Sequence, residues 1–256
     1  MKKQLCLTAD IGGTNTRVAL FDNEKLLESS CMTYSNNEYD SFETVIENYF
    51  DLVNESSVKF AGIAAAGPIQ EKSAKMTNLS WSLTERSIAS ITGAEQVGII
   101  NDLQAQGYGL TSLDQADLEP ITVGSQSANS NATRLVCGIG TGFNAAPVFN
   151  VGHKIFVPPS EAGHSQLSLT DKSYQPVFAK IGSVGSFVSV EDILSGRGLE
   201  NVGRALTGND ETASQIMQKV SQGDENSKKV AHLLTTCAGS FFGDLALILL
   251  PFGGIY

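Results

Sequence analysis

The stretch Thr8-Ala-Asp-Ile-Gly-Gly-Thr-Asn-Thr-Arg17 decides how the first part of this chain folds. An apolar run at residues 5–9 predicts a β-strand that delivers Asp10 to a Gly-Gly turn, and a second apolar run at residues 18–21 predicts the returning strand. Glycine adopts positive φ without steric cost, so both glycines are free to do so and to leave backbone N–H groups unpaired at the tip.

Unpaired N–H groups on a turn can bind an anion, and the hydroxyls of Thr14 and Thr16 would add donors. An acidic side chain beside a bound phosphate suits a hydrated Mg²⁺, because Mg²⁺ keeps most of its waters, and Asp10 stands at that position. The alternative is a hairpin whose turn needs glycine for its geometry alone. This stretch by itself does not decide between a phosphate site and a plain turn.

Composition limits the classes of function. With 256 residues, the chain is long enough to bury a full core in one or two domains. Its net charge of −10 argues against a surface for nucleic acid or for an anionic membrane. An acidic protein can still bind ATP through local N–H donors and a metal ion.

The cysteines and the apolar runs predict a cytoplasmic chain without a membrane segment. The four cysteines lie far apart and form no Cys-x-x-Cys pair, which favours reduced thiols over a metal or redox site. The apolar run after the basic start is broken by Asp10 before it reaches the length of a signal sequence. The most apolar segment, residues 245–252, is too short to span a bilayer.

Helix and strand patterns alternate in the first part of the chain. Apolar spacing predicts helices over residues 39–53, 82–92 and 103–110, and continuous apolar runs predict buried strands over residues 58–66 and 97–100. This alternation predicts an α/β fold with a mixed sheet, in which Asn101 and Asp102 stand at the carboxyl end of a strand. Composition changes between residues 113 and 133, which predicts two domains, 1–112 and 113–256.

The second domain begins with an echo of the first hairpin, because apolar runs over residues 135–138 and 145–149 flank the turn Gly138-Ile-Gly-Thr-Gly142. Phe143 stands where a dinucleotide fingerprint needs its third glycine, and no Gly-Lys-Ser/Thr occurs, so neither that fingerprint nor a Walker loop is present. Helices are predicted over residues 174–181, 190–194, 199–206, 211–221 and 226–250. The last one is apolar all round toward its end, so its carboxyl half should be fully buried.

Two Gly-Thr turns, one in each predicted domain, would together hold a triphosphate chain more firmly than a single turn. Further motifs follow in order: Asp10-Ile-Gly-Gly-Thr-Asn15, Met76-Thr-Asn-Leu-Ser-Trp81, Ile99-Ile-Asn-Asp102, Gly138-Ile-Gly-Thr-Gly142, Pro159-Ser-Glu-Ala-Gly-His164, Glu191-Asp-Ile-Leu-Ser-Gly196 and Asp244-Leu-Ala-Leu. In these motifs, which run through the whole chain, the sequence resembles the bacterial glucokinase family. The resemblance implies the two-domain, hexokinase-type, actin-like ATPase fold, which is ribonuclease H-like.

The resemblance implies ATP-dependent phosphorylation of glucose at its 6-hydroxyl, with Asp102 as the general base that accepts the hydroxyl proton. Phosphoryl transfer needs little covalent help, so alignment and charge neutralisation would supply most of the catalysis. A strand-end aspartate suits the role because a rigid sheet fixes its position. The alternative is that Asp102 caps the helix that follows, which the residues alone favour, and both roles can coexist.

The remaining site residues are carried over from the same motifs. Sugar recognition would fall to Asn78, Asn101, Glu161, His164 and Glu191. The β- and γ-phosphates of ATP would meet Gly12, Gly13, Thr14 and Asn15, with Gly140, Thr141 and Gly142 closing from the second domain and Asp10 holding Mg²⁺ through water. The alternative for the two glutamates is solvated surface, and for His164 a loop histidine whose hydrogen bonds are satisfied locally.

The sequence departs from the family pattern at two places. The family usually continues the second turn with another glycine, where this chain has Asn144, which tolerates positive φ but whose side chain would crowd the phosphate path. Family members also run on past residues 252–256 into a strand, an adenosine-binding turn and closing helices. We therefore expect a fold without that strand and those helices, less of an adenine wall, and uncovered apolar surface that a homodimer partner would fill.

Two other functions remain open at this point. One is a catalytically weak sugar-binding or regulatory homologue that has lost its affinity for nucleotide. The other is a kinase of another hexose, such as mannose or an amino sugar, although the Cys/His zinc cluster common in the broader sugar-kinase and repressor group is absent from the sequence. The sequence does not decide between ATP, ADP and polyphosphate as donor.

Overall fold

The computed structural model describes residues 4–23, 25–67, 69–76, 79–122, 131–168, 172–182 and 187–256. The chain divides into two units, Met1–Gln106 and Gly107–Tyr256. This division falls inside helix α3 (Asp102–Gly109), whereas the composition of the sequence predicts the boundary after residue 112.

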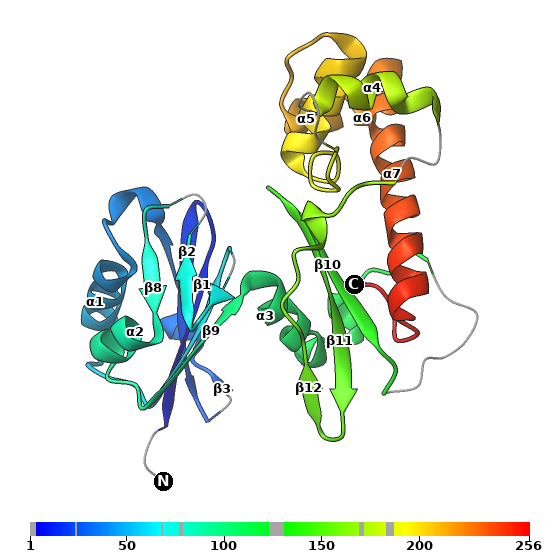
Figure 1. Cartoon of the computed structure of the whole chain (residues 1–256). Helices are drawn as coiled ribbons and strands as arrows, with labels where there is room; N and C mark the ends of the chain where they lie inside the picture. The colour runs from blue at the N-terminus through cyan, green and yellow to red at the C-terminus, as the bar shows by residue number, and fades with distance from the viewer. Residues whose placement is uncertain are drawn as a thin grey trace. The chain divides into compact units, whose positions relative to one another are not determined.

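Unit 1 is built on a six-stranded mixed sheet (Figure 1). Its strands are β1 (Leu5–Ile11), β2 (Asn15–Asp22), β3 (Lys25–Leu26), β4 (Met32–Ser35), β5 (Phe60–Ala65) and β9 (Gln96–Asn101). The order is β3-β2-β1-β5-β9, with β4 also paired to β2. Strands β1 and β2 form the predicted antiparallel hairpin, and β5 and β9 add to β1 in parallel, which confirms the predicted mixed sheet.

Helices α1 (Phe42–Val53) and α2 (Glu85–Thr92) cover the same face of this sheet (Figure 1). Each begins with a capping box, at Ser41 and at Thr84, so the first unpaired N–H groups of the helix are satisfied locally. Alternate residues of β1 are buried, as expected for a strand with one face on the core. A small separate sheet contains β6 (Ile69–Gln70), β7 (Ser73–Lys75) and β8 (Ser82–Thr84).

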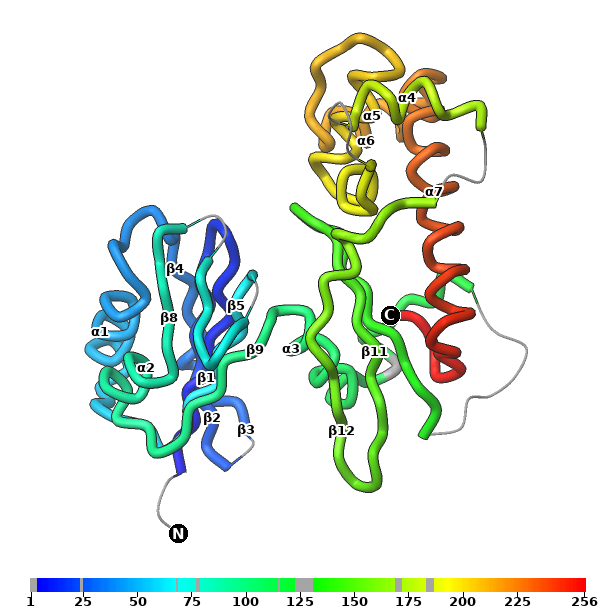
Figure 2. The backbone as a smooth tube through the Cα atoms, in the orientation of Figure 1, coloured from blue at the N-terminus to red at the C-terminus, as the bar shows by residue number. Residues whose placement is uncertain are grey.

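Unit 2 combines an antiparallel sheet with a group of helices. The sheet contains β10 (Arg134–Ile139), β11 (Phe143–Val151) and β12 (Lys154–Phe156), and the helices are α4 (Gln175–Ile181), α5 (Gly196–Thr207), α6 (Ala213–Ser221) and α7 (Glu225–Leu249). The tube in Figure 2 shows α7 running from the group α4–α6 to a position beside the sheet. Phe143 joins the two parts, because its ring meets that of Phe241 on α7 edge-on at 5.5 Å.

Two predictions for this unit are wrong. Residues 190–194 form turns instead of a helix, because Ser189 and Asp192 bond to each other and the N–H of Val190 donates to Ser165. The carboxyl half of α7 is only partly buried: Phe241 lies in the core, whereas Leu247 and Ile248 are 79% and 73% exposed.

Helix α7 explains the second error. It packs on α5 and α6 along one face, with Val230, Leu233 and Cys237 in the core, while its last turns extend beyond those helices. Within the described ranges, α7 is the one helix long and apolar enough to cross a membrane by length and composition, a test that the core helix of a soluble protein also passes.

Candidate active site

The first Gly-Gly turn is a four-residue loop between the last paired residues of β1 and β2, Ile11 and Thr16. The N–H of Gly12 donates to the carbonyl of Asn15 at 2.9 Å, so it is not available to a ligand. Neither Gly12 nor Gly13 uses its freedom to adopt positive φ. The reason is the loop length, since four-residue hairpin loops are most often built around a type I turn, whose φ angles are negative.

Asn36 supports this turn through its hydrogen bonds. Its Nδ2 donates to the carbonyl of Gly12 at 2.9 Å, its Oδ1 accepts the hydroxyl of Thr16 at 2.7 Å, and its N–H donates to the carbonyl of Thr14 at 2.9 Å. Both Asn36 and Thr16 are buried, so Thr16 is a structural partner of Asn36 instead of the predicted phosphate donor. In the part of the chain that the structure describes, the N–H groups of Gly13 and Thr14 have no hydrogen-bond partner.

Asp10 lies at the end of β1 beside this turn. Its Oδ2 is 3.2 Å from Nη1 of Arg17, and both side chains are substantially exposed. A single accessible carboxylate next to unpaired N–H groups fits a hydrated Mg²⁺ on a phosphate, because Mg²⁺ needs one or two carboxylates and keeps its waters. The described residues contain no cluster of three or more His, Cys, Asp or Glu that would enclose a metal by themselves.

Asn101 and Asp102 stand at the same edge of the sheet as the first turn. The register pairs Ile11 with Ala65 and Ala65 with Asn101, so the ends of β1, β5 and β9 are level. Asp102 opens α3, and burial raises the pKa of its carboxyl group, as does the charge of Asp10, while the N–H of Leu103 opposes this shift. In open α/β sheets, ligands bind at the carboxyl ends of the parallel strands, which is where Asn101 and Asp102 lie.

Asn101 takes most of the capping role that was the alternative for Asp102. Its Oδ1 accepts the N–H of Leu103 at 2.9 Å, and its own N–H donates to Oε1 of Gln104 at 3.1 Å. Asp102 shares in the cap, because its Oδ1 accepts the same N–H at 2.8 Å. Asn101 also donates through Nδ2 to the carbonyl of Gly67 at 3.2 Å and is buried, so its side chain is held firmly at the strand end.

The second turn, in unit 2, joins β10 to β11. The N–H of Gly140 donates to the carbonyl of Gly142 at 2.9 Å, and the N–H of Gly196 donates to the carbonyl of Gly140 at 2.8 Å. The N–H groups of Thr141 and Gly142 have no partner within the described ranges. The turn is therefore fixed at its base by the first residue of α5 and presents two donors at its tip.

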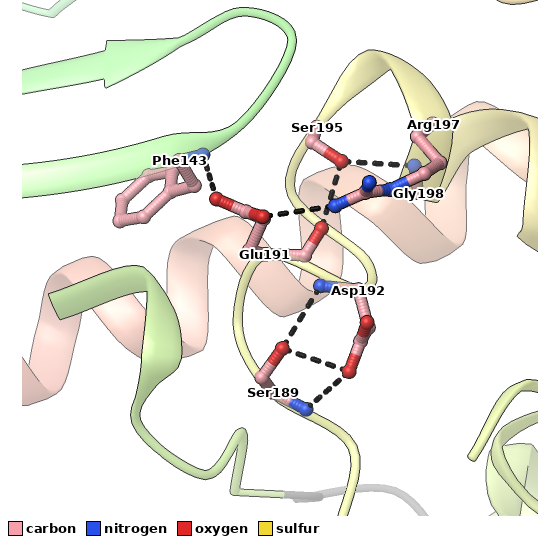
Figure 3. Close-up of polar contacts among 7 residues, drawn as sticks. All are labelled: Phe143, Ser189, Glu191, Asp192, Ser195, Arg197 and Gly198. Carbon is pink, nitrogen blue, oxygen red and sulfur yellow. Dashed lines mark hydrogen bonds and ion pairs between the residues drawn. The ribbon is translucent and has the colours of Figure 1, made fainter. Parts of the chain in front are cut away.

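Glu191 contacts this turn directly (Figure 3). Its Oε2 accepts the N–H of Phe143 at 3.1 Å, and its Oε1 lies 2.9 Å from Nη2 of Arg197. A Cβ atom added at Gly142 would meet Oε2 of Glu191, so glycine is needed there to leave room for the carboxylate. The side chain of Glu191 is 22% exposed, which excludes the alternative of a solvated surface glutamate.

Ser195 holds the segment around Glu191 at the start of α5 (Figure 3). Its hydroxyl accepts the N–H of Gly198 at 2.9 Å, as an N-cap does, and donates to the carbonyl of Glu191 at 2.7 Å. The backbone of Glu191 is thus tied to the same helix end that contacts the turn.

The loop with Glu161 and His164 is anchored to β11 by Asn144. Its Nδ2 donates to the carbonyl of Ser160 at 2.6 Å, and its Oδ1 accepts the N–H of Ala162 at 2.9 Å. Asn144 lies in a strand, does not adopt positive φ, and is engaged with this loop through both ends of its amide. Glu161 and His164 are exposed at the surface of the loop.

The structure brings the predicted residues of each unit together. Unit 1 gathers Asp10, the first turn, Asn101 and Asp102 at one sheet edge, and unit 2 joins the second turn to the segments around residues 160–164 and 189–198. Gly163 links the last two segments to each other, because its carbonyl accepts the N–H of Glu191 at 2.9 Å. Asn78 lies outside the described residues.

Sequence reasoning missed Asn36, and it did not foresee the roles of Asn144 and Arg197. Asn36 stands among other polar residues, and nothing in its sequence neighbourhood indicates that it contacts the first turn. Arg197 follows Gly196 directly, so its place at the end of a recognised motif was the one available signal.

Comparisons with known proteins point in one direction. The model of the family described as Glucokinase matches residues 7–256. The glucokinase of Agrobacterium fabrum is 31% identical over 259 residues, which cover 98% of this chain and 75% of that protein.

Solved structures agree in fold. The crystal structure of a glucokinase from an Antarctic psychrotroph is 28% identical, with a TM-score of 0.81 over 98% of this chain and 81% of that one. The ROK hexokinase from Thermus thermophilus, at 17% identity, has a TM-score of 0.70 over 97% of this chain and 79% of that one. These likenesses confirm the predicted hexokinase-type, actin-like fold.

Proposed function

The chain belongs to the glucokinase family, and from this premise we propose that it transfers the γ-phosphoryl group of ATP to the 6-hydroxyl of glucose. The observation that carries the proposal is the position of Asp102, a largely buried carboxylate fixed at the end of β9 and level with the first turn. No observation favours a sugar-binding protein without catalysis.

Asp102 is the group that we assign as general base. Burial raises the pKa of its carboxyl group, which makes the ionised form a stronger base toward the 6-hydroxyl proton. Its bond to the N–H of Leu103 and the helix that it opens fix its direction. Phosphoryl transfer depends mainly on alignment, so the fixed position of this carboxylate should contribute more to the rate than covalent catalysis would.

We assign the phosphates of ATP to the two turns. The unpaired N–H groups of Gly13 and Thr14 in unit 1, and of Thr141 and Gly142 in unit 2, are donors for phosphate oxygens. Gly12, Asn15 and Gly140 shape these turns, Gly12 and Gly140 through their backbone bonds. Mg²⁺ would supply positive charge to the phosphates when bound, and Asp10 is the residue that would hold it through water.

We assign glucose recognition to Asn101, Glu161, His164 and Glu191, with Asn78 as a further candidate outside the described residues. Carboxylates, amides and an imidazole can each pair with adjacent hydroxyls of a hexose. A site that pairs every hydroxyl rejects analogues that lack one, because its polar groups are then left unsatisfied. The choice of glucose over another hexose rests on this set and on the family.

We also propose that the protein works in the cytoplasm as a homodimer. Leu247, Ile248 and Phe252 are exposed at the end of α7 and beyond it, and a second copy would cover such apolar surface. Light scattering on the protein as it elutes from a size-exclusion column tests the proposed dimer. A mass of twice 27.1 kDa supports the dimer, and a mass of 27.1 kDa overturns it.

A coupled assay of ADP release with glucose and Mg-ATP tests the enzymatic proposal, with Asp102→Asn as the control. Turnover by the native protein that Asp102→Asn abolishes supports it. Absence of turnover, together with glucose binding in calorimetry, would overturn it in favour of a sugar-binding protein. A panel with mannose and glucosamine in place of glucose tests the substrate, and equal rates on all three would overturn the assignment to glucose.

A further inference from the structure

We propose that Arg197 is a positioning residue for ATP, which acts through the carboxylate of Glu191 to hold the turn Gly138–Gly142 in its binding geometry. The inference deepens the proposed function and rests on it. Arg197 itself is not assigned a contact with the substrate.

The contacts form a short continuous path (Figure 3). Nη2 of Arg197 lies 2.9 Å from Oε1 of Glu191, and Oε2 of the same carboxylate accepts the N–H of Phe143 at 3.1 Å. Phe143 directly follows Gly142, whose N–H is one of the two unpaired donors of the turn. The cation therefore fixes the orientation of a carboxylate that in turn fixes the residue beside the donor.

The helix end provides a second tie to the turn. Gly196, the neighbour of Arg197, donates its N–H to the carbonyl of Gly140 at 2.8 Å, and Ser195 caps the helix. The start of α5 and the turn are thus joined on both sides, once through backbone and once through the Arg197–Glu191 pair.

The position of Arg197 is unfavourable for the helix alone. It lies in the first turn of α5, where the helix dipole favours anions, and that first turn contains no acidic residue. The carboxylate of Glu191 offsets this disadvantage. A role in local geometry explains an arginine here better than helix formation does.

Because the Arg197–Glu191 pair is exposed, its loss should affect the position of the turn more than the stability of the fold. The Arg197 side chain is 62% exposed, and ion pairs this accessible contribute little to the stability of a fold. Loss of the cation should leave the protein folded and free the carboxylate to leave the N–H of Phe143. The expected consequence is weaker binding of nucleotide, accompanied by some loss of glucose binding, because the same carboxylate is assigned to the sugar.

Steady-state kinetics on Arg197→Gln and Arg197→Lys test the proposal. We expect Arg197→Gln to raise the KM for ATP about fivefold, the scale of one exposed ion pair, and to raise the KM for glucose by no more than the KM for ATP. Arg197→Lys keeps the charge and should recover most of the loss. Arg204→Gln is the matched control, because it removes an exposed arginine of the same helix that pairs with Asp210 at 2.6 Å.

Calorimetric titration with Mg-ADP provides a readout that does not depend on turnover. Weaker Mg-ADP binding in Arg197→Gln, but not in Arg204→Gln, supports the proposal. Glu191→Gln combined with Arg197→Gln should weaken Mg-ADP binding no more than Glu191→Gln alone, because both act along one path.

Three results would overturn the inference: an unchanged KM for ATP in Arg197→Gln, a change confined to the KM for glucose, or a lysine variant as impaired as the glutamine variant. Failure of the proposed function is a different result, namely native protein that binds Mg-ADP but does not phosphorylate glucose. The titration would then still decide whether Arg197 supports the turn.

Discussion

The carboxylate of Glu191 accepts a hydrogen bond from the backbone N–H of Phe143 across 3.1 Å, although the two residues are 48 positions apart in the chain. Phe143 begins β11 immediately after the second glycine turn, and Glu191 comes from a segment that the sequence predicts to recognise the sugar. One carboxylate therefore links the turn predicted to bind phosphate to the segment predicted to bind the sugar. This relationship makes the packing around the turn open to experiment.

Gly142→Ala should displace this carboxylate, because the new Cβ would meet Oε2 of Glu191. The flexible side chain can move aside, but it then loses its bond to the N–H of Phe143, worth about 0.5–3 kcal/mol, so we expect a lower Tm and a higher KM for ATP. Gly140→Ala is the matched control for stability, since no atom lies within 4 Å of its added Cβ. Equal Tm values for the two variants would contradict the role of Glu191 at the turn.

Asp102→Asn should lower kcat by about 10²–10⁴-fold, the usual contribution of a general base, and leave glucose binding intact. The coupled assay and calorimetry measure the two effects. A variant with near-native kcat would show that Asp102 serves α3 as a cap only.

The pH dependence of stability tests whether the pKa of Asp102 is raised in the folded protein. Its pKa is raised in the folded state, so folding binds its proton more tightly, and the stability from this group is present at low pH and lost as pH rises through the raised pKa. Asparagine has no proton to lose. We therefore expect the Tm of Asp102→Asn, relative to the native protein, to increase from pH 4 to pH 8, and a constant difference would argue against a raised pKa.

Asp10→Ala should remove most turnover while glucose binding persists, because Asp10 is assigned to Mg²⁺ and not to the sugar. Its ion pair with Arg17 is exposed, so the loss of stability should be small, about 0–1 kcal/mol. Turnover and glucose calorimetry on the same preparation check both halves. Loss of glucose binding would mean that the hairpin has a structural role instead.

Asn36→Ala should destabilise the protein and weaken nucleotide binding. The substitution leaves the carbonyl of Gly12 and the buried hydroxyl of Thr16 without their partner, at a cost of about 1–3 kcal/mol. Denaturant unfolding and Mg-ADP titration measure the two effects. Asn37→Ala, which changes an exposed neighbour, should be close to native in both, and similar losses in the two variants would refute the support role of Asn36.

Much of the fold follows from local sequence pattern. The apolar runs around Asp10 suffice for the hairpin, because strands with one buried face show their alternation directly in the sequence. Asp102 was identified at a strand end for the same reason. The family follows from several short motifs that occur together and in the family's order.

The local features that the sequence predicted wrongly depend on tertiary contacts. Residues 190–194 look helical by their apolar spacing, but bonds to Ser165 and Gly163 pull that segment into turns. The end of α7 is apolar, yet whether it is buried depends on which elements reach it, and the sequence of the helix contains no such information.

By itself, the sequence determined the longer strands (β1, β2, β5, β9, β10 and β11), most of the helices, the two glycine turns and the acidic residues beside them, because these depend on neighbours along the chain. Only the tertiary structure decided that Asn36 holds the first turn, that Asn144 holds the loop with Glu161, and that Arg197 and Glu191 meet at the second turn. The contacts of Asn36 with the first turn, of Asn144 with its loop and of Glu191 with the second turn join segments far apart in sequence, and their geometry exists only once the sheets and α5 have packed. Glu191 and Phe143 are the clearest instance of that difference.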